Sequence, residues 1–229
     1  MNARPHSLYR SPDTPRGLPG EPPIPTREHE LAIRAAGARL VAGIDEVGRG
    51  PLAGPVVVAA VVLPVEDPPW LGALRDSKRL SPAVRETLAQ RVLADAAVGI
   101  AAATVREIDT LGIVPAVRLA ARRALALLPC MPDALLLDAF PLPDWDGLQD
   151  APIDGDALCS AVAAASIVAK VARDRIMEGL AHRFPGYGFE RNRGYGTAEH
   201  YAALERLGPS PVHRRSFAPI RALSERGSA

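Results

Sequence analysis

The chain has few cysteines, few aromatic residues and no long apolar runs, and each shortage excludes a class of protein. Two cysteines, Cys130 and Cys159, exclude a disulfide-built scaffold and a four-cysteine zinc site, so we expect reduced thiols and a cytoplasmic protein. No stretch without charged residues reaches the ~20 residues of a membrane helix, and we see no secretory signal. With 48% hydrophobic but only 4% aromatic residues, the 229 residues predict a globular domain with an aliphatic core and no membrane contact.

Charge is unevenly distributed along the chain, although the formal net charge is only +1. Residues 124–169 contain seven aspartates and no lysine or arginine. Residues 182–221 contain seven arginines and three histidines against three glutamates. Either stretch alone could be a solvated surface, but together they favour an acidic site for cations beside a basic lobe for an anion.

Apolar runs and turn residues predict an α/β layered domain after a proline-rich tail. Four runs rich in aliphatic residues predict strands at residues 40–47, 56–63, 98–105 and 134–138. Helices are expected at residues 28–40, from 82 onward behind the N-cap Ser81, at 107–128 and at 156–182. Because the strand runs are apolar on both faces, the central sheet should be covered by helices on both sides.

Three carboxylates stand at the ends of predicted strands. Asp45 and Glu46 end the first strand and Asp138 ends a later one, and sites in open α/β sheets gather at such ends. Carboxylates that share one edge favour hard divalent cations such as Mg²⁺ or Mn²⁺. Adjacent strand residues point to opposite faces, so Asp45 and Glu46 share a site only if the strand ends or bends between them. A solvated turn is the alternative for any one of these residues.

A polar stripe runs along the predicted helix at 156–182. Ser166, Lys170, Asp174 and Glu178 follow one another at a spacing of four residues. Periodicity alone leaves two interpretations open for Asp174: a surface ion pair with Lys170, or a fourth carboxylate of the site.

The loop after the first strand contains Gly48, Gly50 and Gly54. Its spacing fits neither the dinucleotide-binding fingerprint nor a P-loop, and a strand follows it where those motifs need a helix. Glycines would instead let the backbone around Arg49 approach a sugar or a phosphate closely.

Five blocks, in order, resemble the ribonuclease HII family. They span most of the chain, from residue 41 to about residue 219. The blocks are IDEVGRGPLAGP at 44–55, DSKRLS at 76–81, GD at 155–156 with AAASIVAKVARD at 163–174, GYGTAEH at 194–200 and HRRSF at 213–217. Three positions depart from the family pattern: Ala139 stands where a glycine is usual, Asp154 where a lysine is common, and Cys159 where a small or polar residue is usual.

The resemblance implies a ribonuclease H-like α/β fold, with a mixed five-stranded central sheet flanked by helices and a short helical C-terminal lobe. Residues 1–27 would then be a disordered tail, 28–182 the catalytic domain and 183–229 the substrate-binding lobe. The implied enzyme is a monomer that cleaves the RNA strand of RNA/DNA hybrids. It also nicks duplex DNA 5′ of an embedded ribonucleotide, with two Mn²⁺ or Mg²⁺ ions, and leaves 5′-phosphate and 3′-hydroxyl ends.

The resemblance also implies roles for individual residues. The catalytic, metal-binding carboxylates are expected to be Asp45, Glu46, Asp138 and Asp174, with Asp45 bridging the ions and Asp174 on the ion opposite Glu46 and Asp138. The substrate-binding residues are expected to be Gly48, Arg49, Gly50, Lys78, Lys170 and Tyr195. In this set the loop at 48–50 reads the 2′-hydroxyl, Tyr195 packs on the neighbouring deoxyribose, and the two lysines contact phosphates.

Two other functions remain open. A different metal nuclease of the same fold, such as a junction resolvase, would use similar carboxylates without reading a 2′-hydroxyl. A hybrid-binding protein that does not cleave is the second alternative, although the intact acidic positions argue against it.

Overall fold

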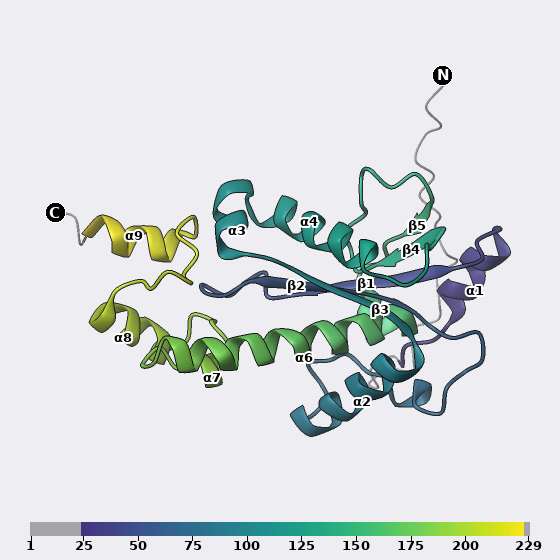
Figure 1. Cartoon of the computed structure of the whole chain (residues 1–229), viewed down its shortest axis with the longest axis horizontal. Coiled ribbons are helices and arrows are strands. Elements are labelled where there is room, and N and C mark those ends of the chain that lie inside the picture. Colours follow the sequence, from purple (N-terminus) through teal and green to yellow (C-terminus); the bar gives the residue numbers. More distant parts are fainter. Residues whose placement is uncertain (1–23, 227–229) are drawn as a thin grey trace, which may run out of the picture.

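The computed structural model describes residues 24–226 (Figure 1). Most of the predicted disordered tail, residues 1–23, lies outside the described residues. Residues 24–27 lie inside them and are attached to the domain: the Thr26 amide donates to the Leu158 carbonyl at 2.9 Å, and the Thr26 carbonyl accepts from the Ser160 amide at 2.9 Å. The attached part of the chain therefore begins before residue 28.

A mixed five-stranded sheet forms the centre of the molecule, as predicted. Its strands are β1 (Val41–Val47), β2 (Val56–Val62), β3 (Ala97–Ala103), β4 (Ala134–Leu137) and β5 (Leu148–Asp150). Their order is β3-β2-β1-β4-β5; β1 pairs antiparallel with β2 and parallel with β4. The carboxyl ends of β1 and β4 therefore lie side by side. The strand runs predict the first four strands within two residues, but β5 is too short to show a pattern.

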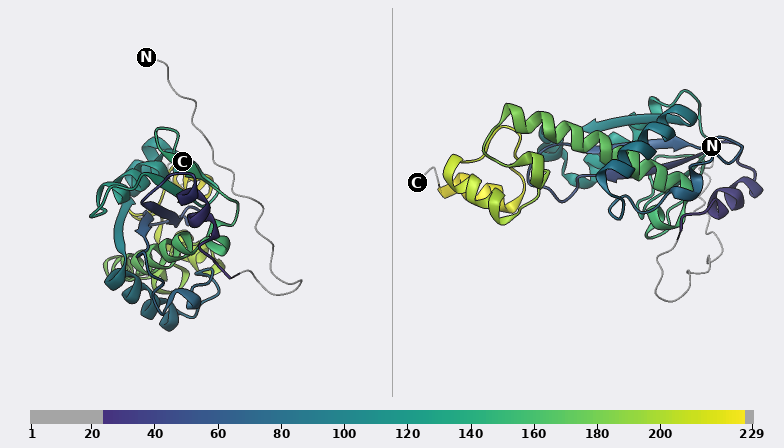
Figure 2. Two further views of the ribbon diagram at one scale, coloured as in Figure 1. Left: turned by 90° about the vertical axis from the view of Figure 1, so that its right-hand side faces the viewer. Right: turned by 90° about the horizontal axis from the view of Figure 1, so that it is seen from below.

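Helices cover both faces of the sheet (Figures 1 and 2). On one face, α3 (Val105–Leu111) and α4 (Ile113–Ala126) pack on Ile44, Val56 and Val58. On the other, α2 (Pro82–Asp95) and α6 (Ser160–Arg183) pack on Val57, Ala59 and Val61. The alternation follows the two-residue period of a strand. It also places Asp45 on the α6 face and Glu46 on the α4 face.

α6 lies unusually close to β1. A Cβ atom on Gly43 would come within 2.2 Å of the Ala161 backbone, so only glycine allows this approach. The close packing brings residues of α6 against the end of β1, where the carboxylates are.

Two predicted long helices are each broken in the structure. The helix expected at 107–128 is divided into α3 and α4 at Gly112. Gly112 has a φ of 84°, which glycine adopts without steric cost. The helix expected at 156–182 divides at Cys159 into α5 (Gly155–Leu158) and α6, because extended Cys159 forms a bridge with Thr26. The first helix, α1 (Glu28–Ala35), stops short of residue 40.

Three C-terminal helices, α7 (Phe189–Asn192), α8 (Ala198–Leu207) and α9 (Ala218–Arg226), lie at one end of the molecule, opposite α1 (Figure 2). Phe189, Leu204 and Ile220 share an apolar cluster with Leu52 and Ala53. The glycine-rich loop is therefore packed directly on this part of the chain. Across residues 24–226, none of the helices has the length and apolarity needed to span a bilayer.

Candidate active site

Asp45 and Glu46 lie within β1, and the strand neither ends nor bends between them. Asp45 pairs with Ala59 and Glu46 with Val58 in a regular antiparallel ladder. The strand end or bend that was the condition for a shared site is therefore absent between these two residues. The two carboxylates point to opposite faces of the sheet near the edge where β1 and β4 end, and the charge of Glu46 still acts on Asp45.

Asp45 is buried beneath α6 and is only 5% exposed. Its Oδ1 accepts from the Glu46 amide at 2.7 Å. Burial raises the pKa of Asp45 well above its usual range, and the charge of Glu46 raises it further. Asp138 and Asp156 act in the same direction, against a hydrogen bond from Ser166 that lowers the pKa.

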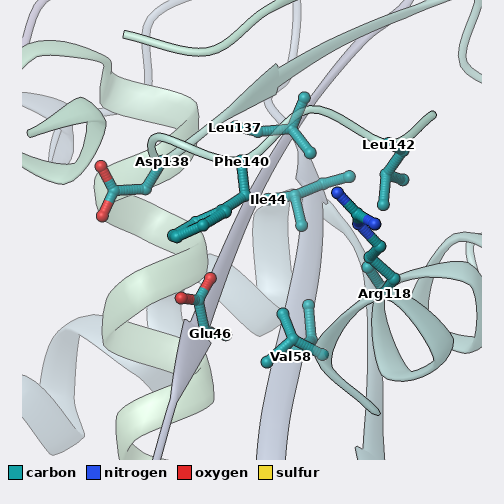
Figure 3. Close-up of a pocket in the computed structure, with 10 residues that line it drawn as sticks. Ile44, Glu46, Val58, Arg118, Leu137, Asp138, Phe140 and Leu142 are labelled. Atoms are coloured by element: carbon teal, nitrogen blue, oxygen red, sulfur yellow. The ribbon is translucent and has the colours of Figure 1, made fainter. Parts of the chain in front are cut away.

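Glu46 lies on the other face, in a small pocket that is otherwise mostly apolar (Figure 3). Its Oε1 accepts from Arg49 Nη1 at 3.1 Å, and the Arg49 guanidinium lies 4.2 Å from the centre of the Phe140 ring. Burial raises the pKa of Glu46 to about 7, even though Arg49 lowers it. The Arg49 side chain is thus engaged by Glu46 and Phe140.

Asp138 follows the last residue of β4, at the edge where β1 also ends. Its Oδ1 accepts from the Gly155 amide at 2.8 Å. Burial raises the pKa of Asp138, against the effect of this hydrogen bond, and Asp156 adds to the rise. The next residue, Ala139, has a φ of 58°, in the left-handed region that glycine adopts more easily. A glycine there would relieve strain, which accounts for the usual glycine at this position; nothing in the structure explains the alanine.

Asp156 is a fourth carboxylate of this cluster, and it is not among the site residues predicted from the sequence. It is buried in the first turn of α5, and it raises the pKa values of both Asp45 and Asp138. Lys78, the expected phosphate contact, places its Nζ 3.3 Å from Asp156 and 3.8 Å from Asp76. Asp156 stands inside one of the blocks that carry the family resemblance, which was the signal available in the sequence.

Asp174 does not join the cluster. Its carboxylate is enclosed by three cations, at 2.7 Å from Lys170, 3.5 Å from Arg85 and 3.8 Å from Arg193. The residue of α6 that forms a hydrogen bond with Asp45 is Ser166. Asp174 lies eight residues further along the same helix, a distance of about 12 Å along the helix axis. In the structure the ion pair between Lys170 and Asp174 forms, and Asp156, rather than Asp174, acts on the pKa values of Asp45 and Asp138. The catalytic role expected for Asp174 stays a prediction.

The donors of the cluster suit a hard cation. Three of these carboxylates, Asp45, Glu46 and Asp138, have raised pKa values, in part because neighbouring carboxylates repel them, and a divalent ion removes that repulsion. Within residues 24–226, no three Asp, Glu, His or Cys side chains already meet at one ligating point. The oxygens must therefore turn inward to share an ion.

The loop at 48–50 presents its backbone beside the carboxylates. Gly48 is buried with a φ of 101°, Arg49 is half-buried and Gly50 is exposed. The amides of Arg49 and Gly50 have no acceptor among the described residues. A Cβ on Gly50 would meet only the Tyr195 ring, at 3.7 Å. The structure therefore brings the loop and the exposed Tyr195 side chain together.

A buried histidine pair holds the backbone at Tyr195. The Ser210 amide donates to His213 Nδ1 at 2.9 Å, so that nitrogen carries no proton. His213 Nε2 then donates to His200 Nε2 at 3.0 Å, and His200 Nδ1 donates to the Tyr195 carbonyl at 2.8 Å. The chain of hydrogen bonds requires both imidazoles to be neutral.

Acid should therefore weaken the fold through this pair. Burial lowers the pKa of His213 from 6.5 to about 4 and also lowers the pKa of His200. The unfolded state then binds more protons between these values, so stability is lost as the pH falls from about 6.5 toward 4. For His213 alone we expect a loss of about 2 kcal/mol between pH 7 and pH 5.

The measurement is the free energy of unfolding in denaturant at both pH values, for the wild type and for His213→Gln. Buried carboxylates with raised pKa values change stability with the opposite sign, so the difference between the two proteins isolates the histidine. If the free energy of unfolding depended equally on pH in both proteins, the conclusion that His200 and His213 are both neutral would be wrong.

Comparison with known proteins agrees with this geometry. The sequence profile described as "Ribonuclease HII" matches residues 42–220. The chain belongs to the ribonuclease HII family. Ribonuclease HII of Synechococcus sp. (strain JA-3-3Ab) is 52% identical over 201 residues, which cover 87% of this chain and 90% of that protein. Ribonuclease HII of Rhodospirillum rubrum is 56% identical over 192 residues, covering 82% and 88%.

Solved structures share the fold. The ribonuclease H2 of Pyrococcus horikoshii OT3 matches with a TM-score of 0.70 and 28% identity, over 82% of this chain and 98% of that one. Bst-RNase HIII, solved in complex with Mn²⁺, matches with a TM-score of 0.61, over 86% and 72% of the two chains; its 22% identity shows the fold alone. Family membership makes this chain a nuclease of the hydrolase class and supports endoribonuclease activity on RNA/DNA hybrids.

Proposed function

We propose that the chain hydrolyses the RNA strand of RNA/DNA hybrids and nicks duplex DNA on the 5′ side of an embedded ribonucleotide, with divalent metal ions at the carboxylate cluster. The observation that carries the proposal is the position of that cluster beside a loop whose Arg49 and Gly50 amides have no acceptor within residues 24–226. A hydrolytic site and a sugar-reading backbone thus share one edge of the sheet.

Asp45, Glu46, Asp138 and Asp156 would hold two Mn²⁺ or Mg²⁺ ions. When bound, such ions supply an activated water and stabilise the leaving 3′-oxygen, which gives 5′-phosphate and 3′-hydroxyl ends. Asp45 would be the central ligand, because it is the most deeply buried of the four and its pKa is influenced by all three others. Asp174 would lie outside the metal site, in an ion pair with Lys170.

Selection for RNA would come from the loop. The 2′-hydroxyl is the group that distinguishes a ribose from a deoxyribose, and a backbone amide can donate to its oxygen. Arg49 and Gly50 offer such amides, and Tyr195 offers a ring face for the next sugar. Lys78, exposed at the rim of the cluster, is placed for a phosphate, whereas Lys170 is occupied by Asp174.

The test is a direct assay with three labelled substrates: an RNA/DNA hybrid, a DNA duplex with one ribonucleotide, and the same duplex of DNA only. We expect cleavage of the first two, dependent on Mn²⁺ or Mg²⁺, and none of the third. Asp45→Asn should be inactive on all three. Cleavage of the all-DNA duplex, or of an all-DNA four-way junction, would favour the general nuclease; binding of the hybrid without cleavage in either metal would favour the binding protein.

A further inference from the structure

Two arginines are fully buried behind the loop at 48–55. Arg173 in α6 and Arg214, between α8 and α9, are both 0% exposed. Within the described part of the chain, neither forms an ion pair with a carboxylate, and all of their hydrogen bonds go to backbone carbonyls. A buried guanidinium without a carboxylate is costly, so its placement needs an explanation.

Arg214 determines which way the first part of the loop faces. Its Nη2 donates to the Gly48 carbonyl at 2.6 Å, and its Nη1 donates to the Arg49 carbonyl at 2.8 Å. In a planar trans peptide, the N–H points opposite to the C=O. With both carbonyls turned inward, the amides of Arg49 and Gly50 must point outward, toward the exposed side of the loop.

The same arginine ties this first part to the end of the loop. Arg214 Nε and Nη2 donate to the Gly54 carbonyl at 3.0 and 2.9 Å. Arg173 holds the neighbouring carbonyls: its Nε donates to Pro55 at 3.0 Å and its Nη2 to Ala53 at 3.3 Å. The loop is thus closed around the two guanidinium groups, which also place positive charge behind the outward amides.

The two buried guanidinium groups repel each other, so this arrangement costs free energy. Burial lowers the pKa of Arg214 to about 9, and the charge of Arg173 lowers it further. Carbonyl oxygens compensate for the lost hydration, and a polyanionic substrate in front of the loop would compensate for the charge.

We propose that Arg214 is a positioning residue for sugar selection, which sets the direction of the two peptide groups that meet the ribose 2′-hydroxyl. The inference rests on the proposed function. Arg214 touches no substrate in this arrangement. It acts through the carbonyls of Gly48 and Arg49, while Arg173 secures the returning end of the loop.

The test compares wild type and Arg214→Lys in one assay with Mg²⁺. The readouts are kcat/KM on a duplex with one ribonucleotide, and the inhibition constant of the same duplex made of DNA only. A lysine ammonium lacks the planar fork and leaves at least one of the two carbonyls unheld. We expect kcat/KM to fall about tenfold or more, because two outward hydrogen bonds to the sugar weaken, with the inhibition constant of the all-DNA duplex within about twofold.

Arg85→Lys is the matched control. Arg85 is also a buried arginine, and it donates to the carbonyls of Ser77 and Leu80, in a different loop. If Arg85→Lys weakens the binding of both duplexes, kcat/KM on the ribonucleotide duplex should fall by the same factor by which the inhibition constant of the all-DNA duplex rises. Parallel changes in both readouts for Arg214→Lys would show a merely structural role and overturn the inference.

If Arg214→Lys does not fold, Arg214→Gln carries the same two readouts, because its single amide group also lacks the planar fork that holds both carbonyls. A parallel change in both readouts for this variant would overturn the inference. Failure of the proposed function is separate, because the wild type would then not cleave the ribonucleotide duplex at all.

Discussion

Asp156→Asn is expected to lower kcat by about 100-fold or more, whereas Asp174→Asn should leave it within about threefold of wild type. Asp156 is buried among the other carboxylates and raises their pKa values, so its charge is part of any cation site there. An asparagine keeps its size but removes one negative charge from the ligand set. Metal affinity should fall together with kcat.

Asp174→Asn should act on stability instead. Its carboxylate faces Lys170, Arg85 and Arg193, and an amide leaves these cations without a counter-charge. We expect a loss of about 1–3 kcal/mol in the free energy of unfolding. The measurements are steady-state kinetics over a range of Mn²⁺ concentrations and denaturant unfolding of both variants. An inactive Asp174→Asn beside an active Asp156→Asn would restore the assignment expected from the sequence.

Gly50→Ala should abolish most of the cleavage without harming the fold. Its methyl group would make only an ordinary 3.7 Å contact with the Tyr195 ring. In the proposed complex, that methyl group occupies the space between the loop and the tyrosine where a sugar must enter. A displacement of the sugar by about 1 Å costs on the order of 100-fold in kcat/KM.

Gly48→Ala is the contrasting variant. Its Cβ would lie 2.1 Å from Arg173 Nε, at a φ of 101° that an alanine tolerates poorly. We expect it to lose stability, by roughly 1–3 kcal/mol, as well as activity. Thermal unfolding and kcat/KM of both variants separate the two effects. If Gly50→Ala cleaved as fast as the wild type, the proposal that the loop at 48–50 recognises the sugar would be wrong.

The sequence predicts the parts of this structure that follow from periodicity and from strand ends. Four apolar runs become β1–β4, and the carboxylates at 45, 46 and 138 lie at the same edge of the sheet because the ends of parallel β1 and β4 are adjacent. Ser81 caps α2 as expected, through a hydrogen bond from the Val84 amide to its Oγ. These features depend on local patterns, which a sequence shows directly.

What the sequence could not predict depends on contacts between distant segments. The sequence pattern singles out Asp174, and only the folded chain shows that Asp156 lies next to Asp138 while Asp174 lies two turns of α6 beyond Ser166. Cys159 breaks a helix because Thr26 pairs with it, over a separation that no window of sequence covers. Arg214 belongs to a basic stretch that suggests anion binding at the surface, yet it turns inward to hold carbonyls.

In the proposed function, the 2′-hydroxyl determines where the enzyme cuts. Two labelled DNA duplexes of identical sequence test this, with the single ribonucleotide moved by one position between them. We expect one nick in each duplex, always on the 5′ side of the ribonucleotide, with 5′-phosphate and 3′-hydroxyl ends, and a product that changes length by one nucleotide. A nick that stays at the same sequence position, or appears in the all-DNA duplex, would contradict it.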